Sequence, residues 1–204
     1  MARTAVTASL AVLVAVGAAV QPQVTAAAGQ RLAVAPAVGL LDVDDRIVDP
    51  FLAAEQSRAI VFLFASVDCP ISNRYAPVVQ RLHDRFAAQG VAFWLVYPNP
   101  AETPGAIRAH VKAFNYPVHA LRDPRHELVK MTGVSVTPEA AVYDRQRALV
   151  YRGRIDDRYV RLGVERFAAT QHDLQDALAA TLDSQRVSQP STPAVGCFIA
   201  DFVY

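Results

Sequence analysis

The sequence predicts an α/β domain with a central mixed β-sheet flanked by helices. Two continuous apolar runs, Ala59–Ala65 and Val91–Tyr97, have the composition of strands buried on both faces of a sheet. The segment between them has helical periodicity, so these elements form a βαβ half. Two later short strands separated by a polar turn predict an antiparallel hairpin, and a last helix follows them.

The first helix is predicted over residues 72–89. Its apolar residues recur at steps of three and four positions: Tyr75, Val78, Val79, Leu82 and Phe86. Gly90 supplies a C-terminal cap, and Pro77 is expected to kink the helix.

The other elements follow from local start, stop and turn residues. Thr103-Pro104 and Asp123-Pro124 each combine an N-cap residue with proline at the first helical position. The expected elements are a hairpin over 43–48, a helix over 104–114, a strand over 118–121, a helix from 123 to Gly133, strands over 140–143 and 149–151, and a helix over 170–182. A βαβ half followed by a ββα half is the order of the thioredoxin fold.

The chain is expected to have three parts. Residues 1–28 have Arg3 as their only charge, an apolar stretch over 5–20 and a small-residue cleavage site before Gly29, which predicts a signal peptide. An uncleaved N-terminal anchor is the alternative. Residues 29–183 are the predicted domain and 184–204 a C-terminal tail. The mature chain is therefore expected to be periplasmic or secreted, with no membrane span after signal cleavage.

Charge and cysteine content argue against a nucleic-acid-binding protein and against a disulfide scaffold. The formal net charge is +1 and no run of Lys or Arg stands out, which gives no reason to expect a nucleic acid partner. The two cysteines, Cys69 and Cys197, are too few for a disulfide scaffold. They form one long-range bridge, a redox pair, or a reactive thiol with a bystander.

Cys69 lies between the first buried strand and the first helix. A thiolate at a helix N-terminus faces unpaired N–H groups and the positive end of the helix dipole, which lower its pKa. Pro70 suits the first turn because its missing N–H costs nothing there. We expect an accessible, reactive thiol; the alternative is a small buried apolar residue at a strand end.

These residues resemble the redoxins of the thioredoxin superfamily, which span thioredoxin-like reductases and the AhpC/TSA type of peroxiredoxin. Cys69 and Pro77 keep the spacing of the reductase motif, but Ser72 stands where the second cysteine would be. Gly133–Pro138 (GVSVTP) matches the segment that carries the family's cis proline. The resemblance implies a cis Thr137–Pro138 bond facing Cys69, with that backbone holding the substrate chain.

The peroxiredoxin pattern matches in part. Ser66 fits the hydroxyl position that orients a peroxide, whereas Phe62 replaces the motif proline. Arg74 or Arg154 is a candidate for the guanidinium that such peroxidases use.

Ser72 and Cys197 each have two interpretations. The Ser72 hydroxyl either satisfies a backbone donor in the first helical turn or stabilises the Cys69 thiolate. Because Ser72 cannot resolve a mixed disulfide, Cys197 is the one candidate for a resolving thiol. Cys197 lies in a short apolar segment of the tail. Either this segment folds back over the domain and brings Cys197 to Cys69, or Cys197 merely helps the tail to pack.

The segment after the hairpin and the histidines give weaker indications of function. Arg154, Asp156 and Asp157 follow the hairpin and either contact a partner or form a solvated salt bridge. The five histidines have no ligand spacing with cysteine, so no metal and no other cofactor is expected.

The leading functional hypothesis is an extracytoplasmic thiol-disulfide oxidoreductase that uses the Cys69 thiol in a C-x-x-S motif. Its partner is a protein thiol or disulfide. The first alternative is a peroxidase that reduces hydroperoxides through Cys69. The second is a redox-inert binding module.

Overall fold

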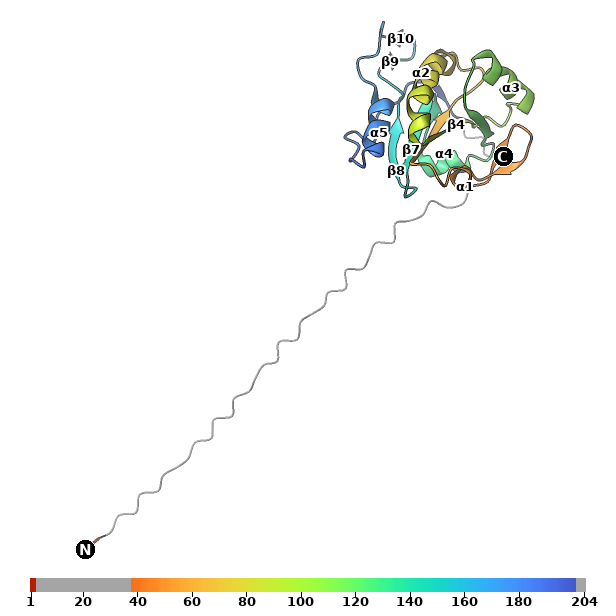
Figure 1. Ribbon diagram of the computed structural model, residues 1–204. Coiled ribbons are helices and arrows are strands. Elements are labelled where there is room, and N and C mark those ends of the chain that lie inside the picture. Colours follow the sequence, from red (N-terminus) through yellow and green to blue (C-terminus); the bar gives the residue numbers. More distant parts are fainter. Residues whose placement is uncertain (3–37, 201–204) are drawn as a thin grey trace. The chain divides into compact units, whose positions relative to one another are not determined.

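The computed structural model describes Met1, Ala2 and residues 38–200 (Figure 1). The strands are β1 (Leu40–Asp42), β2 (Ile47–Val48), β3 (Ala59–Phe64), β4 (Val91–Tyr97), β5 (His119–Arg122), β6 (Val136–Thr137), β7 (Glu139–Asp144), β8 (Leu149–Gly153), β9 (Tyr159–Arg161), β10 (Val164–Glu165) and β11 (Cys197–Phe198). The helices are α1 (Pro50–Ala53), α2 (Pro70–Phe86), α3 (Pro104–Ala113), α4 (Glu127–Thr132) and α5 (Asp173–Leu182), with a 3-10 turn at Ala87–Gln89.

Seven strands form one mixed sheet in the order β2-β1-β5-β4-β3-β7-β8. Strand β4 pairs in parallel with β3 and β5, whereas β7 runs antiparallel to β3 and β8. The predicted central mixed sheet, its βαβ unit and the later hairpin are therefore confirmed. The short hairpin near residue 45 also forms, as β1 and β2.

Helices cover both faces of this sheet (Figure 1), which explains why all six residues of β3 are buried. Val61 and Leu63 belong to a core cluster that includes residues of α2, α3 and α5. Ile60, Phe62 and Phe64 belong to a second cluster, with residues of α1 and α4. A strand covered on both sides needs apolar residues on both, hence the continuous run AIVFLF.

Helix α2 begins two residues earlier than predicted, at Pro70, with Cys69 as its N-cap residue. Pro77 lies inside the helix. Gly90 ends the 3-10 turn with φ = 91°, a left-handed conformation that favours glycine. This end of the helix matches the prediction.

The predicted helix start at Asp123-Pro124 is wrong. The chain first makes a turn, in which His126 N–H donates to the Asp123 carbonyl, and α4 begins only at Glu127. The Asp123 carboxylate still accepts hydrogen bonds from the N–H groups of Glu127 (2.8 Å) and Val129 (2.9 Å). The acidic residue thus satisfies helix donors from outside the helix. The predicted end at Gly133 is confirmed.

Helix α1 and the β9–β10 hairpin were not predicted, because they are very short. The predicted signal peptide, apart from its first two residues, lies outside the described residues. Within the described part of the chain, no helix is long and apolar enough to cross a membrane.

Candidate active site

Cys69 lies at the N-terminus of α2, where the loop after β3 ends. The helix starts there because Pro70 has the fixed φ of a first helical residue. The Cys69 side chain is only 2% exposed, so the expectation of an accessible thiol is wrong. The cysteine is covered by a segment that is distant in sequence.

That segment is β11, the part of the C-terminal tail that contains Cys197. Strand β11 pairs antiparallel with β6, and Cys197 is opposite Thr137. The Cys197 Sγ atom lies 2.7 Å from the Cys69 Sγ atom, and both thiols are free. The prediction that the tail returns across the domain and brings the two cysteines together is confirmed.

The tail reaches this position along the outer strand β8. Arg152 N–H donates to the Pro190 carbonyl, and Thr192 N–H donates back to the Arg152 carbonyl. The hydroxyls of Thr192 and Tyr151 lie 2.7 Å apart. Gly153 leaves room for Thr192, since a Cβ atom there would lie 2.2 Å from Thr192 Oγ1. These contacts fix the tail five residues before Cys197.

The two thiols differ in their electrostatic environment. Burial raises the pKa of Cys69, but hydrogen bonding with Cys197 and Ser72 outweighs it, so the Cys69 pKa lies below its usual value of 9.0. Burial, followed by the hydrogen bond and the charge of Cys69, raises the pKa of Cys197 to about 12. Cys69 is therefore the thiol of the pair that ionises first.

Ser72 and Thr137 both interact with the Cys69 sulfur. Ser72 is buried, and its hydroxyl has no other hydrogen-bond partner among the described residues, so it is available to a charged Cys69. The protonated Cys69 thiol donates to the Thr137 carbonyl oxygen at 3.0 Å. The Thr137–Pro138 peptide bond is cis, which confirms that prediction.

Ser66 lies in the loop before Cys69, but its hydroxyl is bound by a carboxylate. It donates to Glu102 Oε1 at 2.7 Å, and Val67 N–H donates to the same oxygen. Glu102 is buried, and burial raises its pKa despite these two donors. Its other carboxylate oxygen has no partner among the described residues.

The two candidate arginines are both held by acidic residues. Arg74 pairs with Glu165 at 2.5 Å, beside the cysteines, on the wall of a cavity that Cys197 also lines. The Arg154 guanidinium pairs with Asp173 at 2.8 Å and also donates to Gln171.

Asp156 and Asp157 are buried, so a solvated loop is the wrong description of this segment. Asp156 accepts a hydrogen bond of 2.5 Å from the Tyr75 hydroxyl, and Asp157 accepts bonds from Thr170 and Gln171. These contacts attach the segment to α2 and to the loop just before α5.

A series of hydrogen-bonded polar side chains next to the Cys69 loop was not predicted from the sequence. Asn73 Nδ2 donates to the Val67 carbonyl, and its Oδ1 atom lies 2.7 Å from His110 Nε2. His110 Nδ1 lies 2.7 Å from the Tyr97 hydroxyl. Because Asn73 Oδ1 can only accept, Nε2 carries the proton and Nδ1 accepts from Tyr97. The only sequence signal was the position of Asn73 in the first turn of α2.

Two cavities adjoin Cys197. A small one of about 100 Å³ is lined by Ser66, Thr137, Cys197 and their neighbours. A more open one of about 400 Å³ lies between Pro70, Ile71 and the β9–β10 hairpin. Cys197 therefore lines both cavities, whereas the buried Cys69 lines neither of them.

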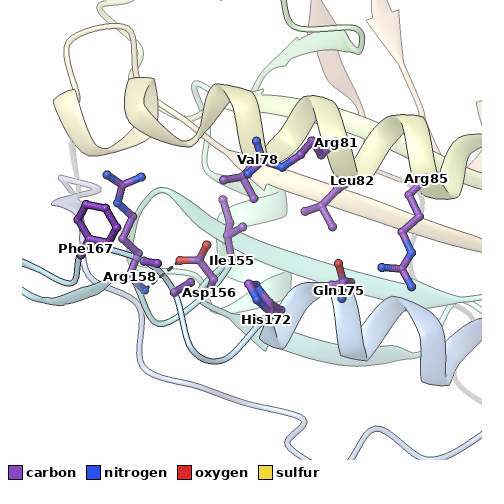
Figure 2. Close-up of a pocket in the computed structure, with 12 residues that line it drawn as sticks. Val78, Arg81, Leu82, Arg85, Ile155, Asp156, Arg158, Phe167, His172 and Gln175 are labelled. Atoms are coloured by element: carbon purple, nitrogen blue, oxygen red, sulfur yellow. Dashed lines mark hydrogen bonds between the residues drawn. The ribbon is translucent and has the colours of Figure 1, made fainter.

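Another cavity, of about 520 Å³, is lined by Asp156 but by neither cysteine. Figure 2 shows it between α2, which contributes Arg81 and Arg85, and α5, which contributes Gln175. The Asp156 carboxylate on its wall accepts a hydrogen bond from Arg158 N–H. Among the described residues, no group of three or more His, Cys, Asp or Glu side chains is placed to hold a metal ion.

Solved structures share this fold. A hypothetical protein from Sinorhizobium meliloti is 30% identical, with a TM-score of 0.71 over 81% of this chain and 91% of that one. An uncharacterized conserved protein from Geobacillus kaustophilus is 26% identical, with a TM-score of 0.72 over 83% of this chain and 91% of that one. A secreted Mycobacterium tuberculosis disulfide oxidoreductase homologous to E. coli DsbE is 21% identical, with a TM-score of 0.51 over 75% of this chain and 99% of that one.

The last of these similarities concerns the fold alone, and it confirms the predicted thioredoxin fold. No curated protein matches the chain. The model of the AhpC/TSA family matches residues 33–153, which is more than half of the chain and includes Cys69, Ser72 and the Thr137–Pro138 segment. The chain belongs to the AhpC/TSA family.

Proposed function

We propose that the protein is an extracytoplasmic thiol-disulfide oxidoreductase in which Cys69 is the nucleophile and Cys197 the resolving thiol. The observation that carries this proposal is the 2.7 Å contact between two free sulfur atoms. A resolving cysteine must be able to reach the sulfur of the nucleophile, and Cys197 lies within reach of Cys69. The signal-like N-terminal sequence supports the extracytoplasmic location.

The proposed reaction has two thiol-disulfide exchange steps. The Cys69 thiolate attacks one sulfur of a partner disulfide, forms a mixed disulfide and releases the other partner sulfur as a thiolate. Cys197 gives its proton to the partner thiolate released in the first step, attacks the Cys69 sulfur and releases the second partner thiolate, which takes a proton from water. The partner gains two electrons and the protein ends with a Cys69–Cys197 disulfide, which an external dithiol reduces.

The surroundings of Cys69 match the roles expected in this reaction. The Cys197 and Ser72 hydrogen bonds favour the Cys69 thiolate, so the nucleophile forms at lower pH than an ordinary thiol. The raised pKa of Cys197 keeps that thiol protonated, and therefore a hydrogen-bond donor, until it is needed. In this proposal the tail residue Cys197 takes the role of the second cysteine of the reductase motif, which would otherwise lie at position 72 in the first turn of α2.

The same contacts argue against the two alternatives. A peroxidase needs a hydroxyl and a guanidinium directed at the peroxide. Here Ser66 donates to Glu102, and the two candidate arginines, Arg74 and Arg154, are paired with Glu165 and Asp173. A redox-inert module has no use for two thiols in contact. We therefore favour a disulfide as the substrate.

The test compares the wild type, Cys197→Ser and Cys69→Ser, each treated with glutathione disulfide or hydrogen peroxide and then mapped by peptide mass spectrometry. We expect a Cys69–Cys197 disulfide in the wild type, glutathione trapped on Cys69 in Cys197→Ser, and neither in Cys69→Ser. Faster reaction with peroxide, giving a sulfenic acid on Cys69, would instead indicate a peroxidase. Inertness towards both reagents would support the binding module.

A further inference from the structure

The edge of β6 beside Cys69 is paired with the chain's own tail. In the β6–β11 pair, Cys197 is opposite Thr137 and Phe198 is opposite Val136. Ile199 N–H then donates to the Ser135 carbonyl at 3.0 Å. The tail therefore lies on this edge as an added antiparallel strand, which is how extended peptides bind to open sheet edges.

This added strand is short and only partly covered by the domain. Phe198 is 81% exposed, so its ring buries little apolar surface. Strand β11 is only two residues long, and its sheet contains no strand besides β6. Val195, Cys197 and Ile199 pack against the core, but each is only partly buried. A two-residue strand held by partly buried residues opens at a lower free-energy cost than a core strand, so another extended chain can replace it.

Gly196 sets a steric condition for any chain in this register. A Cβ atom at Gly196 would lie 2.2 Å from the Thr137 carbonyl oxygen, 2.6 Å from the Thr137 carbonyl carbon and 3.1 Å from Pro138 N. All three are backbone atoms of the domain, which cannot rotate away as a flexible side chain would. A residue larger than glycine just before the cysteine therefore pushes the strand off the edge.

We propose that the edge formed by Val136 and Thr137 binds an extended segment of a partner protein that carries glycine directly before its reactive cysteine, and that residues 196–199 leave the edge to admit it. This proposal rests on the proposed function. When Cys197 has moved away with the tail, Ser72 remains as the hydrogen-bonding group beside the Cys69 thiolate. This thiolate attacks the sulfur of the partner's cysteine, which is disulfide-bonded to another thiol, and that other thiol departs as a thiolate.

The test uses two full-length proteins that cannot resolve a mixed disulfide. Cys197→Ser retains the tail on the edge, and Gly196→Val combined with Cys197→Ser displaces it. The probes are symmetrical disulfides of two peptides, Ala-Val-Gly-Cys-Phe-Ile and its matched control Ala-Val-Val-Cys-Phe-Ile. The measured quantity is the rate at which each peptide is trapped on Cys69, followed by mass spectrometry.

We expect the double variant to trap the glycine peptide about tenfold faster than the valine peptide, which corresponds to about 1.4 kcal/mol. We also expect Cys197→Ser to trap the glycine peptide more slowly than the double variant does, because its tail competes. Equal rates for the two peptides, or equal rates in the two proteins, would overturn the docking proposal.

Glutathione disulfide provides the reference reaction. If it modifies Cys69 in both proteins while the peptides are not discriminated, the docking proposal fails and the proposed function stands. If it modifies Cys69 in neither protein, the proposed function fails and the docking proposal fails with it. Should circular dichroism show the double variant to be unfolded, Gly196→Ala replaces Gly196→Val, since its Cβ atom meets the same backbone atoms.

Discussion

The Sγ atoms of Cys69 and Cys197 lie 2.7 Å apart, although 128 positions separate the two residues in the chain. One thiol belongs to the N-cap residue of α2 and the other to a two-residue strand of the tail. The contact depends on the pairing of β11 with β6 and on the anchoring of Thr192 to β8. The burial of Cys69 and its contact with a second thiol therefore depend on the position of the tail.

Cys69→Ser is expected to abolish thiol chemistry while the protein remains folded. Serine is among the preferred N-cap residues, so the free energy of unfolding should change by no more than about 1 kcal/mol. Urea unfolding followed by circular dichroism measures the stability, and labelling with a thiol reagent measures the chemistry. Wholesale unfolding of the variant would identify Cys69 as a structural residue.

Ser72→Ala is expected to raise the pKa of Cys69, because it removes the side-chain hydrogen bond that favours the thiolate. The rate of iodoacetamide alkylation at Cys69 should fall several-fold near neutral pH, with a pH midpoint above that of the wild type. Ser66→Ala is the matched control, since that hydroxyl donates to Glu102. A midpoint that does not move in Ser72→Ala would leave Ser72 a purely structural role.

The buried His110 should make stability depend on pH. Burial lowers the pKa of His110 below its usual value of 6.5, so between the two pKa values the unfolded chain binds more protons than the folded one. The resulting stabilisation is complete above pH 6.5 and is lost as the pH falls through the folded-state pKa. His110→Gln should show a smaller decrease in stability on acidification than the wild type.

The measurement for His110 is urea unfolding at a series of pH values between 5 and 8. His119→Gln is the control, because His119 is exposed and lies at the start of β5. Wild-type and His110→Gln curves that stay parallel across this range would show that His110 does not carry the effect.

Gly153→Ala is expected to weaken the attachment of the tail. The new Cβ atom would lie 2.2 Å from Thr192 Oγ1 and 2.5 Å from the Thr192 carbonyl oxygen, and φ at Gly153 is 154°. Overpacking of this kind destabilises by about 1–3 kcal/mol. Formation of the Cys69–Cys197 disulfide should slow down, which peptide mapping after timed oxidation measures.

Gly105→Ala is the control for this substitution. Its Cβ atom would meet only Thr103 Oγ1, at 3.9 Å, and alanine in a helix stabilises by up to about 1 kcal/mol relative to glycine. A normal rate of disulfide formation in Gly153→Ala would show that Thr192 does not position Cys197.

The sequence by itself determined the features that depend on local patterns. The buried strand β3, the position of Cys69 before α2, the cap at Gly90 and the Thr137–Pro138 segment were all predicted. Each of these features follows from the periodicity, caps or motif of a few adjacent residues. Local patterns failed at Asp123, where the chain makes a turn before the helix begins.

Tertiary structure alone decided how the site is assembled. The sequence left open whether Cys197 would meet Cys69, and it did not show that Cys69 would be buried beneath the tail. It also did not show that Ser66 would be bound by Glu102. These contacts join residues that are far apart in the chain, and which ones form depends on how the tail and loops pack against the completed sheet.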